Sequence, residues 1–401
     1  MEVEEGDTLL NSTNEKRSQI AISNVSLWGF SFLFVAIVGV FVFEVESGGT
    51  SIQTLLTHDR HGPPPKSMCS NDDFTKTTLK ADLDATYAAL IKDKRGENKF
   101  EASDVVIIDD KFYSICDNSW SIQVIGSHFT PLDHTNYQIG APQGDSDFES
   151  IIYDSFTDVF YLIRESQPIA SVNKDEPDSY HAIVHQVKIT EDGKDYTTLE
   201  TCVSEFTFQD HTKGFEGAVT MVDPVTNTTY LLGLCEGNLC MSGSTGETPG
   251  NGRIVVMVKT QIDNPSVMYD GQYTCQYSTI RIIDIPKSAY FEDYSAIAVN
   301  PWNGKVAITS QQYSQIWIGD MTMHGPGNSF DPMKSELIED GAFVYNFPRD
   351  DDCNIIYCNV EGIHWLSDSM FVGVSDKMKS GGRQDYRCRS KDQSIHLFSL
   401  P

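Results

Sequence analysis

A two-part unit of β-rich sequence recurs five times in this chain, and that repetition limits the folds open to it. The first copy, residues 101–117, reads EASDVVIIDDKFYSICD: a polar head, an apolar run, an acidic turn and a second apolar run. Two β-rich segments joined by a short acidic turn predict a β-hairpin. The pattern returns near 148–163, 215–234, 294–308 and 360–374. The five copies open on small or acidic polar residues: Ser103, Glu149, Glu216, Ser295 and Glu361.

Further strand-like runs lie between the hairpins. One set follows the hairpins, at 122–125, 181–189, 253–259, 315–318 and 394–400, and another precedes the next heads, at 137–140, 203–208, 278–285 and 342–347. Long repeats of this kind predict an all-β, five-bladed β-propeller over residues 80–401. Closure would bring 395–400 near the strand that starts the first blade. Six blades is the alternative, and a two-sheet sandwich is disfavoured because five matched hairpins suit a ring.

An apolar segment near the N-terminus predicts a membrane anchor. Residues 20–43 are long enough for a transmembrane helix, which needs about 20 residues, and Lys16 and Arg17 precede them. The positive-inside rule then places residues 1–19 in the cytosol as a short tail. Residues 44–79, with their Gly-Pro-Pro-Pro run, are expected to form a stalk. The alternative is a cleaved signal peptide, whose apolar core is usually shorter, about 7–15 residues.

The charge of the chain excludes one class of partner, and its cysteine content indicates a cellular compartment. The net charge is −28, from 29 basic and 57 acidic residues, which excludes nucleic acid as a partner. All nine Cys follow the apolar segment, so we expect disulfides and a single-pass type II protein of the secretory pathway or cell surface. Cys235–Cys240 and Cys353–Cys358 are close enough to pair locally, with a metal site as the alternative. Asn227 begins a glycosylation sequon in the same lumenal part.

The repeated heads predict a cation site on the propeller axis. The first residue of each inner strand faces the central channel, so Glu149, Glu216 and Glu361 would converge there. Several buried carboxylates need a counter-charge. Ca²⁺ takes about six to eight oxygen ligands, and Ser103, Asp104 and Ser295 are compatible with that shell. The alternative is that these glutamates are ordinary acids at strand starts that face solvent.

The first unit and the segment before it resemble the calcium-activated nucleotidase (apyrase) family. The match is carried by Ala-Asp-Leu-Asp at 81–84, by 101–117 and by 360–363, and it extends as a pattern over 80–401. The resemblance implies a five-bladed propeller and a central Ca²⁺ site built, in order, from Ser103, Asp104, Glu149, Glu216, Ser295 and Glu361. Residues 360–376 also resemble phytase-like and esterase-like propellers, a competing resemblance.

The chain departs from the family where basic residues are expected. A Pro-Arg-Arg segment of the family is replaced by Gly-Leu-Cys-Glu-Gly at 233–237, and a Lys-Ser-Glu-Glu segment by Thr-Ser-Gln-Gln at 309–312. Basic side chains hold phosphate through charge-assisted hydrogen bonds. Arg164 and Lys377 end inner hairpins and are candidates to replace them, although basic residues at such places are usually only solvated.

Two functions follow as hypotheses. The first is a membrane-anchored, Ca²⁺-dependent phosphohydrolase that cleaves nucleoside diphosphates or other phosphorylated small molecules, with Asp82, Asp84 and Asp117 as acid–base candidates. The second is a non-catalytic, Ca²⁺-stabilised propeller that binds glycans or proteins. The missing basic residues favour the second, and the Ala-Asp-Leu-Asp segment with its ordered ligand set favours the first.

Overall fold

The computed structural model describes one unit within Pro63–Pro401. The described residues are 69, 72–92, 99–142, 144–169, 178–241, 249–263, 273–325, 329–377 and 391–401. No helix among them is both long and apolar enough to cross a bilayer. The expected tail 1–19, the membrane segment 20–43 and residues 44–68 of the expected stalk lie outside this part of the chain.

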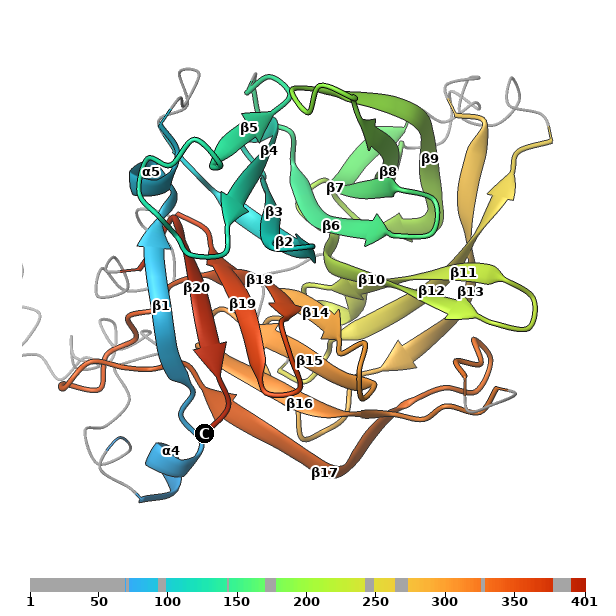
Figure 1. Ribbon diagram of the computed structural model, residues 1–401. Helices are drawn as coiled ribbons and strands as arrows, with labels where there is room; N and C mark the ends of the chain where they lie inside the picture. The colour runs from blue at the N-terminus through green and yellow to red at the C-terminus, as the bar shows by residue number, and fades with distance from the viewer. Residues whose placement is uncertain are drawn as a thin grey trace, which may run out of the picture. The chain divides into compact units, whose positions relative to one another are not determined.

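The strands form five antiparallel groups of four, each built on one sequence repeat (Figure 1). The first group is β2 Ala102–Ile108, β3 Lys111–Cys116, β4 Ser119–Gly126 and β5 Tyr137–Ile139. The second is β6 Phe148–Asp154, β7 Val159–Ile169, β8 Ser179–Ile189 and β9 Tyr196–Phe208. The third is β10 Phe215–Asp223, β11 Thr228–Cys235, β12 Arg253–Gln261 and β13 Cys275–Asp284.

The last two groups complete the set. The fourth is β14 Ala296–Val299, β15 Lys305–Ser310, β16 Gln315–Met321 and β17 Leu337–Asn346. The fifth is β18 Val360–Trp365, β19 Met370–Ser375, β20 Ser394–Ser399 and β1 Lys80–Thr86. The described helices are short: α4 Asp72–Lys76, α5 Tyr87–Leu90 and the 3-10 turn η1 Asn238–Cys240.

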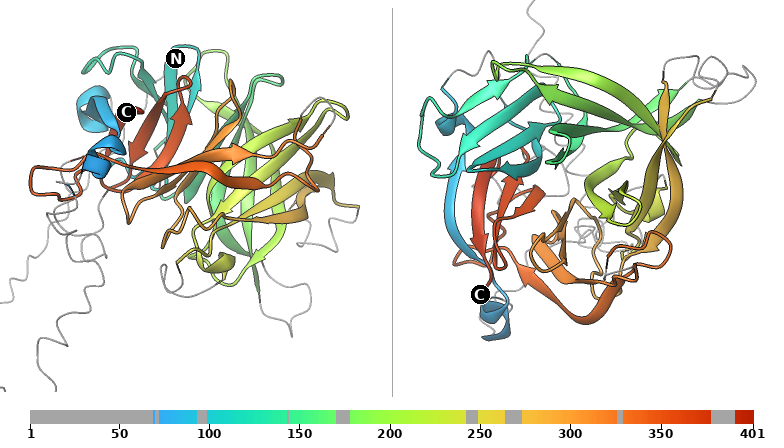
Figure 2. Two further views of the ribbon diagram at one scale, coloured as in Figure 1. Left: turned by 90° about the horizontal axis from the view of Figure 1, so that it is seen from below. Right: turned by 45° about the vertical axis from the view of Figure 1, so that its right-hand side comes forward.

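The five groups are arranged around an axis as the blades of a β-propeller (Figure 2, right). The first strands touch one another in a closed ring, in the order β2, β6, β10, β14 and β18. Five apolar clusters lie between successive groups, so each sheet is buried on both faces. Burial on both faces explains the nearly continuous apolar runs of the inner strands. The expected all-β propeller is confirmed.

The ring closes through the N-terminal strand. β1 is the outermost strand of the fifth group and pairs with β20, from Lys80 opposite Ser399 to Thr86 opposite Ser394. The segment 81–84, which carries the family resemblance, is therefore an edge strand. Leu79, from the end of the expected stalk, is buried in the cluster between the fourth and fifth groups.

Disulfides add covalent links, and one expected pair is wrong. Cys235–Cys240 forms as predicted, which removes the metal alternative for these two residues. Cys353 pairs with Cys69 instead of Cys358, because the ring brings the start of the unit beside the loop after β17. A third disulfide, Cys202–Cys275, joins β9 to β13. These two strands pair in parallel, so the second and third groups form one eight-stranded sheet.

The inner ring is packed so closely that it requires glycine at two seams. A Cβ on Gly362 of β18 would lie 2.4 Å from the Cα of Asp104 in β2. A Cβ on Gly217 of β10 would lie 2.8 Å from the backbone nitrogen of Ile297 in β14. Backbone cannot move out of the way as a flexible side chain can. The two glycines therefore set the spacing of the ring.

We expect Gly362→Ala to lower the free energy of unfolding by about 1–3 kcal/mol, the usual effect of overpacking. Gly126→Ala in β4 is the matched control, because its nearest neighbour is the Thr135 hydroxyl at 3.2 Å, a side chain that can rotate. Urea unfolding of the two variants measures the difference. Equal midpoints for both variants would contradict the close packing described here.

Candidate functional site

A β-bulge recurs at one register position of the inner strands and sets the axial residues apart. The pairing of β2 with β3, β6 with β7, β10 with β11 and β18 with β19 skips one residue in each case. The skipped residues are Ser103, Glu149, Glu216 and Glu361. A bulged residue leaves the ladder and its side chain is re-aimed. Ser295 stands at the same level just before β14, where its N–H donates to the Thr309 carbonyl at 3.0 Å.

The carboxylates at these positions act on one another electrostatically. The pKa of Glu149 lies well above its ordinary value, first because of burial and then because of the negative charge of Glu216. Glu165, Asp117 and Glu361 raise this pKa further. Glu149, Glu216 and Glu361 come from three different groups of strands, so the ring brings them within electrostatic reach. We call these three glutamates the axial acids.

The axial acids are near one another but spread. Their oxygens do not all lie within 4.8 Å of one another, the spacing at which three ligand atoms share one small cation. Among the described residues, the group that does meet this spacing is Glu200, Cys202 and Cys275. Its two sulfurs form a disulfide, so it is not a metal site.

A second set of acids stands next to the axial acids at an equivalent level of the second strands. In each group, the residue just before the bulge pairs with a residue of the second strand, and the acid comes directly after that partner. We call these acids the rim acids: Asp117, Glu165, Glu236 and Asp376. Gln311 stands at the corresponding place after β15. Sequence analysis selected only Asp117. The other three could have been found from the same register, because each follows the second apolar run of its repeat by a fixed offset.

Two lysines pair with acids beside the inner strands. Lys213, in the loop before β10, is buried, and its ammonium lies 2.6 Å from Glu236. Burial lowers the pKa of Lys213, but Glu236 and, more weakly, Glu216 outweigh it, so this pKa is raised overall. Lys377 lies 3.8 Å from the Glu101 carboxylate. Lys377 was a candidate from the sequence pattern, whereas Lys213 was not, because it lies in a loop outside the repeated hairpins.

Arg164 has a structural role. Its Nε donates to the Ser146 carbonyl at 2.6 Å, and its guanidinium lies 3.0 Å from the Asp147 carboxylate. The same group lies over the Trp120 ring at 5.1 Å. These contacts hold the loop before β6, the strand that carries Glu149. Arg164 therefore positions the entry to the site rather than extending freely into it.

Asp104 and Ser295 join adjacent groups of strands. The Asp104 carboxylate accepts hydrogen bonds from the Ser150 hydroxyl at 2.8 Å and the Ile151 N–H at 3.0 Å, both in β6. Burial raises its pKa to about 7. The Ser295 hydroxyl donates to the Val360 carbonyl at 3.0 Å. Both side chains lie at the level of the axial acids, and both already serve as links between the inner strands.

Asp82 and Asp84 lie far from the axial acids. Both are on β1, three strands outward from β18, which carries Glu361. Neighbouring strands are about 4.8 Å apart, so this offset is roughly 14 Å. Asp82 pairs with Lys80 at 2.5 Å and Asp84 with Lys391 at 2.5 Å. Of the three acid–base candidates, the structure brings only Asp117 to the axial acids.

Comparisons with known proteins add little. No family model and no curated protein matches the chain. Among solved structures, the β-propeller domain of Myceliophteria thermophila Cps50 (Swd1) is 8% identical with a TM-score of 0.35, over 80% of this chain and 100% of that one. Kuenenia stuttgartiensis hydrazine synthase is 8% identical with a TM-score of 0.32, over 69% of this chain and 93% of that one. A functionally unknown protein from Desulfotomaculum acetoxidans is 10% identical with a TM-score of 0.29, over 69% of this chain and 77% of that one. Structural similarities this distant do not indicate a function for this chain.

The raised pKa of Glu149 predicts a pH dependence of stability. A carboxyl whose pKa is higher in the folded state binds its proton more tightly there, so its contribution is present at low pH and declines as pH rises above the unfolded value, near 4. In the presence of a chelator, Glu149→Gln should therefore lose less stability than the wild type between pH 5 and pH 8. Urea midpoints at both pH values measure this.

Glu339→Gln is the control for that comparison, because Glu339 is an exposed glutamate on β17 and its loss changes the net charge equally. The control should follow the wild-type pH dependence. If both variants changed that dependence by the same amount, overall charge rather than the axial acids would be its cause.

Proposed function

We propose that this protein is a five-bladed propeller that uses an axial Ca²⁺ ion to hydrolyse nucleoside diphosphates or related phosphorylated small molecules. The supporting observation is the bulge register. Five residues of the types and order expected from the apyrase resemblance occupy one level of five successive inner strands. The proposal includes a single N-terminal membrane anchor in the secretory pathway or at the cell surface, with which the disulfides between described cysteines are compatible.

The donor chemistry fits a hard cation. Glu149, Glu216 and Glu361 offer carboxylate oxygens, and Ser103 a hydroxyl, which is the ligand type that Ca²⁺ prefers. The raised pKa of Glu149 shows how poorly its charge is compensated by the protein alone. These four residues would hold the ion partly through water, because the oxygens of the three glutamates do not all lie within 4.8 Å of one another. Asp104 and Ser295, already bonded to neighbouring strands, would keep the inner strands in place around it.

Bound Ca²⁺ would supply positive charge to the phosphate oxygens of a substrate. The chain supplies the groups around it. Asp117, beside the axial acids, is the candidate to accept a proton from an attacking water. Lys213 provides a buried positive charge beside Glu216, which partly offsets the repulsion between the acids and a phosphate. Asp82 and Asp84 lie on the outer edge, so their placement does not support a direct role in this reaction.

The second candidate is a non-catalytic, Ca²⁺-stabilised propeller that binds glycans or proteins. The composition of the rim favours it. Glu236 and Gln311 stand where the family resemblance leads us to expect basic residues, and Glu236 already binds Lys213. A phosphate group would meet more acids than bases at this rim. Catalysis would then depend on the metal alone for charge compensation.

We expect the purified chain to release phosphate from UDP, GDP or ADP with Ca²⁺ and not with a chelator. Asp117→Asn should lower this rate by a factor of about 100 or more, as expected for loss of a general base, without lowering the melting temperature. Glu339→Gln is the matched control. Phosphate release that survives in Asp117→Asn would assign the proton transfer to another residue.

Melting temperature separates the two candidates. Ligand binding to the folded state alone stabilises it by about 2.7 kcal/mol at a hundredfold excess over Kd. Ca²⁺ should raise the melting temperature more than Mg²⁺, and Glu216→Gln should reduce the rise. A calcium-dependent rise without phosphate release would select the non-catalytic candidate. No response to Ca²⁺ or chelator would remove the axial acids as a metal site.

A further inference from the structure

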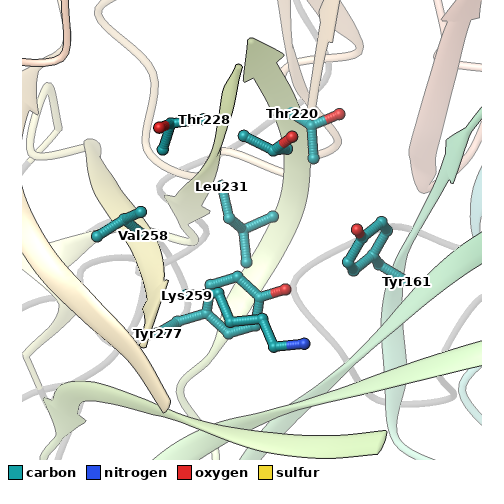
Figure 3. A pocket seen from close by; sticks show the side chains of 8 residues that line it. Tyr161, Thr220, Thr228, Leu231, Val258, Lys259 and Tyr277 are labelled. Atoms are coloured by element: carbon teal, nitrogen blue, oxygen red, sulfur yellow. The ribbon is translucent and has the colours of Figure 1, made fainter. Parts of the chain in front are cut away.

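A cavity lies at the one seam where two groups of strands are fused. It has a volume of about 200 Å³ and lies between β7 of the second group and β10–β13 of the third (Figure 3). Its lining residues are Tyr161, Thr220, Thr228, Thr229, Leu231, Val258, Lys259 and Tyr277. It is distinct from the axial acids, because none of the axial or rim acids lines it.

The walls of this cavity are fixed at both ends. Near the axis, β6 contacts β10. At the periphery, β9 and β13 are hydrogen-bonded in parallel and joined by the Cys202–Cys275 disulfide. Among the described strands, no other pair of neighbouring groups shares a sheet. A cavity held at both ends is pre-organised, which lowers the entropy that a ligand must overcome.

The lining is rich in hydroxyl groups. The side chains of Tyr161, Thr220, Thr228 and Thr229 make no hydrogen bond to other residues in the described part of the chain. The Tyr277 hydroxyl accepts from Gln186 Nε2 at 3.5 Å, which leaves its own proton to donate. Figure 3 shows the Tyr277 hydroxyl and the Lys259 ammonium pointing towards the side where Tyr161 lies. Each hydroxyl can both donate and accept.

The electrostatics of the cavity select a neutral ligand. Lys259 is the one charged residue in the lining, and its ammonium binds the Glu200 carboxylate and also donates to Gln186 Oε1 at 3.3 Å. That pairing leaves little net positive charge for an anion. The volume equals roughly six or seven water molecules at about 30 Å³ each. Such a space matches the size of one six-membered ring with hydroxyl substituents and is smaller than a nucleotide.

From this lining we propose that the cavity binds a single pyranose ring. The sugar hydroxyls would exchange hydrogen bonds with the threonines and tyrosines, and its C–H face would lie against Leu231 and the tyrosine rings. Two sources could supply that ring. One is a free sugar or the glycan of another molecule. The other is a glycan on Asn227, an exposed turn residue followed directly by Thr228 and Thr229 of the lining.

The test uses a double variant that keeps shape and removes two unpartnered hydroxyls, Thr220→Val with Tyr161→Phe. The matched control is Thr198→Val with Tyr345→Phe, which removes the same groups from strands that do not line the cavity. In the first arm, full-length protein from a non-glycosylating host is titrated with glucose, galactose, mannose and N-acetylglucosamine, followed by NMR. We expect millimolar binding of at least one sugar, weakened at least tenfold in the double variant only.

In the second arm, protein from a glycosylating host is treated with an endoglycosidase. A glycan seated in the cavity should be released several-fold more slowly from the wild type than from the double variant. Binding in the first arm identifies an external sugar, and protection in the second identifies the glycan of Asn227. If no sugar binds and release is equally fast in all proteins, the cavity is not a sugar site. Asn227→Gln confirms which glycan is measured.

Discussion

The pairing of β1 with β20 is the contact on which the rest of the structure depends. The chain begins and ends its fold in the same group of strands, so this one ladder converts a row of hairpins into a ring. Without it, β20 would be an exposed edge, and the fifth group would be held against the first by side-chain packing alone. The axial acids come within electrostatic reach of one another only because the ring is closed. A closed ring is therefore required for any chemistry at the axis.

The centre of the ring combines tight packing with unfavourable charge. Gly362 and Gly217 bring backbones into contact, and Asp104 and Ser150 bind one inner strand to the next. At the same level, the pKa of Glu149 is raised by burial and by neighbouring carboxylates. Repulsion of this kind would spread the inner strands if they were weakly joined. The links between neighbouring strands are thus what allows acids to be concentrated on the axis.

Features that depend on local pattern can be predicted from this sequence, whereas features that depend on ring closure cannot. Apolar runs, polar heads and acidic turns are local, so the five hairpins, their outer strands and the shared strand-start position of Glu149, Glu216 and Glu361 were predicted from sequence. The role of residues 81–84 as an edge strand was not, because its partner lies at the other end of the chain. The Cys69–Cys353 disulfide was missed for the same reason. Glu165, Glu236 and Asp376 were also missed. Each comes just after the second apolar run of its repeat, where acidic residues are common in ordinary turns.

The Cys69–Cys353 disulfide changes how the propeller responds to mechanical force. Its two cysteines are 284 residues apart in sequence, and Cys353 lies in the loop between β17 and β18. Tension applied to the chain before Cys69 passes through the sulfur atoms into that loop. It does not have to travel along β1, so it does not peel the closing strand from β20. The ring can be pulled by its N-terminal side while the ladder that closes it carries almost none of the force.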